Sequence, residues 1–174
     1  NIAEASKQSK YDENVILVPA SKTVSIDIIN QLPSLGIHTV GENKAQELLS
    51  KYPYGRDIEW HFIGRLQTNK VKYIVDRVEM IESVHSFKLA KEISKQSVKH
   101  GKIINILLEV NIGKEESKSG FSEDELIPAF NAIKKFGHRQ FNYYTLKVNL
   151  TKDEAGYWEK FFIKLFQANN RKYG

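Results

Sequence analysis

Short runs of apolar and β-branched residues recur along the chain, and each is followed by a stretch in which apolar residues return every three or four positions. The runs predict five β-strands, at Val15–Ala20, Ile37–Val40, Ile58–Ile63, Val78–Val84 and Ile103–Ile112. The stretches that follow them have the period of an amphipathic helix. The pattern therefore predicts a chain in which strands alternate with helices.

Local signals mark where several of these helices begin and end. Ser86 is placed to cap a helix that stops near Gly101, and Ser122 followed by Glu125 is a capping-box pattern. That box opens a helix over Glu123–Lys135, which Gly137 ends. Apolar stripes at helical spacing are formed by Ile28, Ile29 and Leu32 and by Leu89, Ala90 and Ile93.

A last helix is expected from about Asp153 to Arg171. One of its faces is aromatic and aliphatic and is expected to lie against the core; it comprises Trp158, Phe161, Phe162, Leu165 and Phe166.

Strands that alternate with helices of this length indicate βαβ units and a parallel sheet. Parallel strands that are buried on both faces read as nearly continuous apolar runs, as these do. Either a doubly wound sheet or part of a (β/α)8 barrel fits the alternation. The 174 residues form one domain by length, and they fall short of the roughly 200 that a complete barrel usually needs.

Composition narrows the class of protein. Hydrophobic residues make up 41% of the chain and charged residues 27%, as in an ordinary globular protein. Cysteine is absent, which excludes disulfide scaffolds, thiol nucleophiles and zinc–thiolate sites. No His–Glu–His spacing occurs on a helix, so no metal site is expected.

Charge and hydropathy bear on partners and compartment. The 26 Lys and Arg residues exceed the 21 Asp and Glu residues by only five, and they are dispersed, so we expect no nucleic-acid partner. No apolar run reaches the roughly 18–20 residues of a membrane span, so we expect no membrane association. The polar stretch Asn1–Lys10 does not read as a secretory signal, and a cytoplasmic protein is expected.

In both candidate architectures the functional site lies at the carboxyl ends of the strands. Lys22 follows the first predicted strand and shares the parity of Val18 and Ala20. If that side faces a barrel interior, the amine projects into the mouth of the barrel, where it could condense with an aldehyde. The alternative is an ordinary surface lysine in a loop.

Other polar residues stand at the ends of later strands. They include Asn43, Ser83 and Asn111. His61, inside the third predicted strand, is more simply a core histidine with a hydrogen-bond partner than a catalyst. Glu109 shares the parity of Asn111, and the two either line a pocket or lock the barrel core through hydrogen bonds.

Five sequence blocks occur in an order and spacing typical of one family. They are VPASKT around Lys22, GENKAQELL from Gly41, WHFIGRLQTNKVKYIV from Trp60, IESVHS from Ile81 and LLEVNIGKEESKSG from Leu107. With these blocks the chain resembles the pyridoxal-phosphate homeostasis proteins, also called PLP-binding proteins, over residues 10–135. That family is in turn similar to the barrel domain of alanine racemase.

The resemblance implies an alanine-racemase-like (β/α)8 barrel that holds pyridoxal 5′-phosphate (PLP) as an internal aldimine on Lys22. It further implies a non-catalytic carrier in vitamin B6 homeostasis, a monomer or weak dimer that supplies PLP-dependent apoenzymes. We take Lys22, Asn43, His61, Ser83 and Asn111 as the cofactor-binding residues, with no catalytic residue. Two alternatives stay open: a racemase-like PLP enzyme, and a barrel interaction protein without cofactor.

The chain departs from the family pattern at two places. Val24 stands where many relatives carry a second lysine, which makes the site less cationic. Relatives also end with a glycine-, methionine- and serine-rich phosphate loop after the final helix, where this chain ends at Gly174. The stretch Thr145–Asn149 looks like a sixth strand and then passes directly to LTKDEAGYW. We therefore expect a barrel incomplete at its C-terminal end, with residues absent at both ends and near Asn149, and weak cofactor occupancy.

Overall fold

The sheet of the molecule is parallel and its strands follow one another in chain order. The computed structural model describes residues 16–111, 119–137 and 141–145. Its strands are β1 (Thr39–Glu42), β2 (Glu59–Phe62), β3 (Met80–Val84), β4 (Ile104–Leu108) and β5 (Phe141–Thr145). They lie in the order β1-β2-β3-β4-β5, and every neighbouring pair is parallel. A doubly wound sheet would reverse its order at a switch point, so the observed order favours a barrel.

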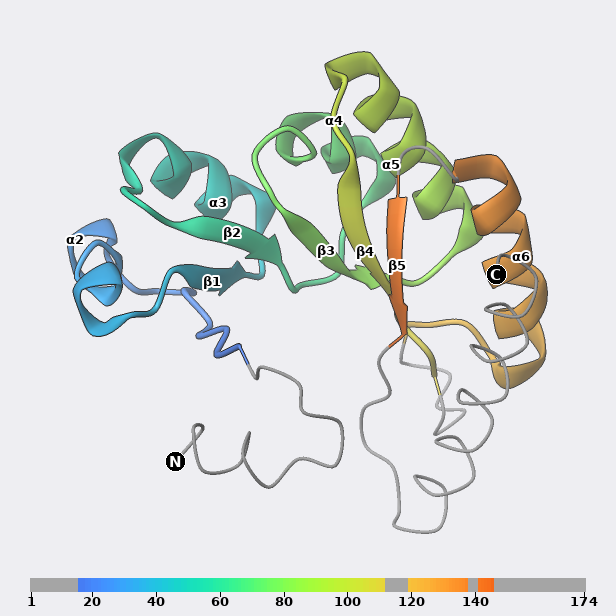
Figure 1. The fold of residues 1–174 in the computed structure, drawn as a ribbon, viewed down its shortest axis with the longest axis horizontal. Coiled ribbons are helices and arrows are strands. Elements are labelled where there is room, and N and C mark those ends of the chain that lie inside the picture. Colours follow the sequence, from blue (N-terminus) through green and yellow to red (C-terminus); the bar gives the residue numbers. More distant parts are fainter. Residues whose placement is uncertain (1–15, 112–118, 138–140, 146–174) are drawn as a thin grey trace, which may run out of the picture.

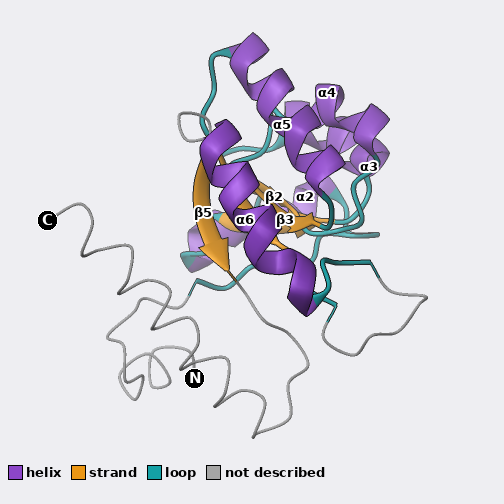
Figure 2. Cartoon of the chain, turned by 90° about the vertical axis from the view of Figure 1, so that its right-hand side faces the viewer, coloured by secondary structure: helices purple, strands orange, loops and turns teal. Residues whose placement is uncertain are grey.

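Several helices lie on one side of this sheet. The helical elements are α2 (Ile26–Ile29), η1 (Leu32–Leu35), α3 (Ala45–Lys51), η2 (Tyr52–Tyr54), η3 (Thr68–Lys70), α4 (Val71–Ile74), α5 (Phe87–His100) and α6 (Glu123–Gly137). Figures 1 and 2 show α3, α4, α5 and α6 side by side over the same face of the strands. Helices on one face of sequential parallel strands are the outer layer of a (β/α) barrel.

The core lies between that face of the sheet and the helices. Trp60 and Phe62 of β2 are buried there with Leu48 of α3, Ile74 of α4 and Ile93 of α5. All four residues of β1 are buried, as expected for a strand covered on both faces, but β2 alternates between covered and accessible positions. The described residues therefore bury one face of β2 fully and the other only in part.

Both predicted helix caps are present. The Ser86 hydroxyl accepts the backbone N–H of Leu89 at 3.3 Å, and α5 ends at Gly101 with φ 61°. At α6 the Ser122 hydroxyl accepts the N–H of Glu125 at 3.3 Å, while the Glu125 carboxylate accepts the N–H of Ser122 at 3.0 Å. The Ser122 hydroxyl also donates to this carboxylate at 3.0 Å, and the two hydrogen bonds that the carboxylate accepts from Ser122 lower the pKa of the Glu125 carboxyl. Such caps satisfy backbone donors that the first helical turn leaves without partners.

The first predicted strand, Val15–Ala20, is not a regular strand in the structure. Val15 lies outside the described residues, and the rest of the run pairs with β1 only near its end, through an isolated bridge between Ala20 and Gly41. The Pro19 carbonyl accepts the Gly41 N–H at 2.9 Å, and Ser21 N–H donates to the Gly41 carbonyl at 2.8 Å. Proline has no N–H to donate to a ladder, and this run forms an edge beside β1, so regular pairing starts late.

The first predicted helix stripe is split between two short elements. Pro33 has no N–H to donate to the carbonyl four residues before it, so the α-helix does not continue and the chain forms α2 and then the 3-10 turn η1. Ile29 is buried as expected, whereas Ile28 is 56% exposed. At the other end β5 stops at Thr145, where a sixth strand was expected to begin, and the expected helix Asp153–Arg171 lies outside the described residues. Among the described helices, none has the length and apolarity needed to cross a membrane.

Candidate functional site

The turn that carries Lys22 has a strained backbone. The N–H of Val24 donates to the Ser21 carbonyl at 3.0 Å, which closes a four-residue turn with Lys22 and Thr23 at its centre. Thr23 has φ 62°, and its hydroxyl donates to the Lys22 carbonyl at 2.6 Å. A β-branched residue rarely adopts a positive φ, and such a residue costs about 1–3 kcal/mol. The surrounding contacts must therefore hold this turn in place.

A buried ion pair supplies that support. Glu42, at the carboxyl end of β1, is fully buried, and its carboxylate lies 2.7 Å from the Lys51 ammonium of α3. The same carboxylate accepts the Ser21 hydroxyl at 2.9 Å and the Asn43 N–H at 2.7 Å. Lys51 also donates to the Ser21 carbonyl at 2.7 Å. These four residues join β1, α3 and the turn. They hold Ser21, the residue before Lys22, in place.

No signal in the amino-acid pattern could have assigned the Glu42–Lys51 pair. Glu42 falls within the block GENKAQELL, but its partner lies nine positions away in a helix. The contact depends on how α3 returns over β1, which no local pattern encodes.

Lys22 is at the expected end of the sheet but is not sheltered by the described residues. Its side chain is exposed, as is that of Ala20 on the same side of the segment, whereas Ser21 on the other side is buried. Ala20 lies beside Gly41, and Gly41 lies beside His61, so this side is the face of the sheet opposite the helices. The predicted orientation toward a barrel interior is consistent with this face, and the role of Lys22 stays a prediction.

His61 lies on the same face and has a partner. Its Nδ1 atom is 2.7 Å from Oε1 of Glu82, and the two side chains are 12% and 25% exposed. This contact matches the interpretation of His61 as a hydrogen-bonded core histidine. Glu82, from β3, was not among the predicted site residues. It could have been noticed as a charged residue inside an apolar strand, because such a residue needs a partner when it is buried.

Asn43 carries a polar atom without a partner. The residue is half-buried, and its side-chain Oδ1 is buried and accepts no hydrogen bond from any described residue. A buried acceptor left in this state costs about 1–3 kcal/mol. A bound molecule with a hydrogen-bond donor would remove that cost, so Asn43 fits a ligand site.

Ser83 and Asn111 have structural contacts of their own. The buried Ser83 hydroxyl donates to the Gly64 carbonyl and so holds the connection that follows β2. The N–H of Asn111 donates to the Phe121 carbonyl at 2.9 Å, which ties the end of the β4 segment to the start of α6. Nearby, the Ser119 hydroxyl donates to Glu109 at 3.2 Å, and residues 112–118 lie outside the described ranges. Contact of Ser83 and Asn111 with a cofactor stays a prediction.

Gly64 lies against the backbone that follows β1. A Cβ atom built at Gly64 would collide with the Asn43 carbonyl oxygen and would lie 2.7 Å from Asn43 Cα. Gly41 is a useful comparison, since a Cβ there would meet only the Ile63 side chain, with Cδ1 at 2.7 Å. The Ile63 side chain can rotate away from an added methyl group at position 41. At position 64 the methyl group would meet main chain, so the connections that carry Gly64 and Asn43 would have to move apart.

We expect Gly64→Ala to destabilise the fold by about 1–3 kcal/mol, because overpacking here must displace main chain. Gly41→Ala is the matched control and should cost less. Urea denaturation of both variants measures the difference. If Gly41→Ala proves as costly as Gly64→Ala, the close approach of the two connections does not limit position 64.

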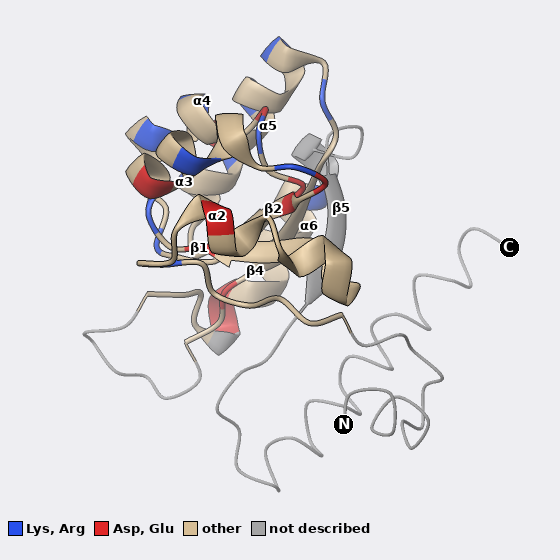
Figure 3. Cartoon of the chain, turned by 90° about the vertical axis from the view of Figure 1, so that its left-hand side faces the viewer, with Lys and Arg blue, Asp and Glu red and all other residues tan. Residues whose placement is uncertain are grey.

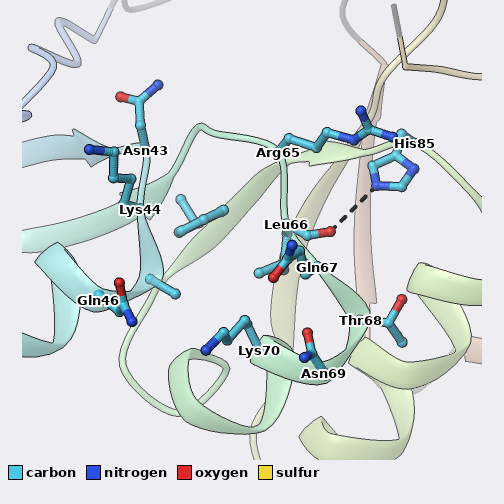
Figure 4. Close-up of a pocket in the computed structure, with 12 residues that line it drawn as sticks. Asn43, Lys44, Gln46, Arg65, Leu66, Gln67, Thr68, Asn69, Lys70 and His85 are labelled. Carbon is cyan, nitrogen blue, oxygen red and sulfur yellow. Dashed lines mark hydrogen bonds between the residues drawn. The ribbon is translucent and has the colours of Figure 1, made fainter.

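The connections that follow β1, β2 and β3 line an open pocket of about 960 Å³ (Figure 4). Its floor includes the buried Phe62 and Leu66. Its rim is polar and includes Asn43 and Gln46 after β1, Gln67 and Lys70 after β2 and His85 after β3. Nε2 of His85 lies 3.4 Å from the Leu66 carbonyl oxygen. Ser21, Lys22 and Thr23 do not line this pocket, which therefore neighbours the lysine turn without containing it.

Comparison with known proteins decides the family. The family model described as the alanine racemase N-terminal domain matches residues 1–152. The chain belongs to that family. Curated relatives include the pyridoxal phosphate homeostasis proteins of Aquifex aeolicus, 42% identical over 132 residues, and of Pasteurella multocida, 33% identical over 143 residues. These alignments cover 74% and 79% of this chain, and the resemblance stated from the sequence blocks is confirmed.

Solved structures confirm the barrel-type fold. PipY of Synechococcus elongatus, in a structure without PLP, matches with a TM-score of 0.71 and 26% identity, over 89% of this chain and 75% of PipY. A second PipY structure, with PLP bound, matches with a TM-score of 0.70 and the same identity and coverage. Alanine racemase of Clostridium difficile 630 matches with a TM-score of 0.71 at 11% identity, over 97% of this chain and 46% of its own, which shows the fold alone.

The chain is shorter than the curated relatives that it matches. It spans 58% of the Aquifex aeolicus protein and 61% of the Pasteurella multocida protein. The fold of this family member is thus established over its described part, and its activity is a matter for proposal.

Proposed function

We propose that this protein binds PLP and acts in PLP homeostasis as a non-catalytic carrier of the cofactor. One observation carries the proposal. Lys22 is held at the carboxyl edge of the sheet, in a turn whose strained Thr23 is supported by the buried Glu42–Lys51 pair. Strain of this kind concentrates at functional sites. The curated relatives named pyridoxal phosphate homeostasis proteins, and the PipY structure with PLP bound, support the same function.

The residues of the site fit this cofactor. When bound, PLP supplies an aldehyde that condenses reversibly with a lysine amine. Lys22 offers an exposed amine that pairs with no carboxylate of a described residue, and Asn43 offers a buried acceptor without a partner. His61, Ser83 and Asn111 are the further proposed contacts. His61 is oriented by Glu82, and Ser83 is oriented by the Gly64 carbonyl.

A visible-absorbance titration of the chain with PLP tests the proposal. We expect a saturable band that borohydride reduction removes, with the label retained on the protein. A protein that stays colourless after addition of PLP, and takes up no label on reduction, would favour the interaction protein without cofactor.

The enzymatic alternative has its own measurement. A racemase-like catalyst must release the α-proton of an amino acid, so the PLP-loaded protein would exchange that proton for deuterium. We expect no exchange across a panel of amino acids, because a carrier needs no proton transfer. Deuterium exchange with any of these amino acids would mean that the protein is an enzyme and not a carrier.

We further propose that this carrier is a cytoplasmic protein, that it is a monomer or weak dimer, and that it passes PLP to apoenzymes. The PLP-loaded protein should then restore the activity of a PLP-dependent apoenzyme faster than the same total PLP released from a non-cognate protein. Equal rates would argue against direct transfer.

A further inference from the structure

The block WHFIGRLQTNK supplies most of a pocket that shares only Asn43 with the proposed PLP-binding residues and does not include Lys22. We propose that this pocket, between the connections that follow β1, β2 and β3, binds the phosphate group of a phosphorylated small molecule. The volume of about 960 Å³ is large enough for a phosphate with an attached polar group and is in the range of small-molecule sites.

The charges of the lining select an anion. Lys44, Arg65 and Lys70 contribute to the pocket, and none of its described lining residues is an aspartate or glutamate. Figure 3 shows Lys and Arg segments (blue) beside α3 and α4, the helices that flank the pocket. Three cationic side chains from two separate connections, with no acidic neighbour in the described lining, favour a dianionic group over a cation or an uncharged ligand.

Two of the three cations are available to a ligand. Lys44 is 3.1 Å from the Glu47 carboxylate, and this contact is the main cause of the lowered pKa of Glu47. Arg65 and Lys70, in contrast, form no ion pair with any residue in the described ranges. Lys70 is half-buried and Arg65 is exposed. A guanidinium and an ammonium at the same pocket are the usual partners of phosphate oxygens.

Side-chain amides supply further donors. Gln46, Gln67 and Asn69 line the pocket, and none of these amides bonds to another residue within the part of the chain that is described. In Figure 4 the Gln46 amide and the Lys70 ammonium extend toward the space between them. Buried Phe62 and Leu66 form the floor beneath these donors and keep water from that side, which strengthens their hydrogen bonds to an anion.

Inorganic phosphate is the probe, and the amide resonances of Gln67 and Asn69 in a nitrogen-15 spectrum are the readout. Phosphate added against a chloride background of equal ionic strength should shift these resonances in a saturable way. Arg65→Ala and Lys70→Ala should each weaken binding about tenfold, since a charge-assisted hydrogen bond contributes that much or more. Both side chains reach the surface, so the variants should fold.

Two control variants distinguish this pocket from general attraction of anions to a basic chain and from the proposed PLP site. Lys72→Ala removes an exposed lysine of α4 that does not line the pocket, and its phosphate affinity should equal that of the parent chain. Lys22→Ala should also bind phosphate as the parent does, because its amine belongs to the neighbouring turn. Shifts that do not saturate, or that Arg65→Ala and Lys70→Ala leave unchanged, would overturn the proposal.

Discussion

Lys22→Ala is expected to abolish covalent capture of PLP, reducing borohydride-trapped label from the level of the parent chain to background. The amine of Lys22 is the one that the strained turn Ser21–Val24 presents at the carboxyl edge of the sheet. Removing it leaves the rest of the turn intact, because Ser21 is held through its own hydroxyl and carbonyl by Glu42 and Lys51. The loss of label should therefore occur without a loss of stability.

Peptide mass spectrometry after reduction makes this measurement. Lys44→Ala is the matched control, since Lys44 is an exposed lysine after the neighbouring strand and pairs with Glu47. It should keep full label on the peptide that contains Lys22. Label that persists in Lys22→Ala and maps to another lysine, such as Lys70, would move the cofactor to the pocket beside the turn.

Glu42→Ala is expected to lower the free energy of unfolding by about 3–5 kcal/mol, because it leaves one partner of a buried ion pair without compensation. The Lys51 side chain is only 12% exposed, and its ammonium would lose a carboxylate at 2.7 Å. The Ser21 hydroxyl and the Asn43 N–H would lose their acceptor in the same step. One substitution thus removes several buried contacts together.

Urea denaturation measures this loss. Glu59→Ala, at an exposed position of β2, is the control and should stay within about 0.5 kcal/mol of the parent. Glu42→Gln should fall between the two, since an amide oxygen can still accept the backbone N–H while the charge is gone. A loss below about 1 kcal/mol in Glu42→Ala would mean that water compensates Lys51 and that the pair does not anchor the turn.

Local features of the fold could be predicted because their causes lie within a few residues. The caps at Ser86 and Ser122 join groups three positions apart, and α5 ends at Gly101 as predicted. Strands β2, β3 and β4 lie inside the predicted apolar runs. The run Val15–Ala20 was wrong as a strand because pairing depends on a neighbour, and Pro19 removes a donor that a regular ladder would use.

By itself, the sequence determined the alternation of strands and helices, the capped helix ends and, through ordered blocks, the family. It placed Lys22 at the carboxyl edge of the sheet. Only the tertiary structure paired Glu42 with Lys51, His61 with Glu82 and Gly64 with the Asn43 backbone, and gathered Arg65 and Lys70 at one pocket. The reason is physical: helix periods and caps depend on neighbours along the chain, whereas these contacts depend on strand register and on the path by which each helix returns to the sheet.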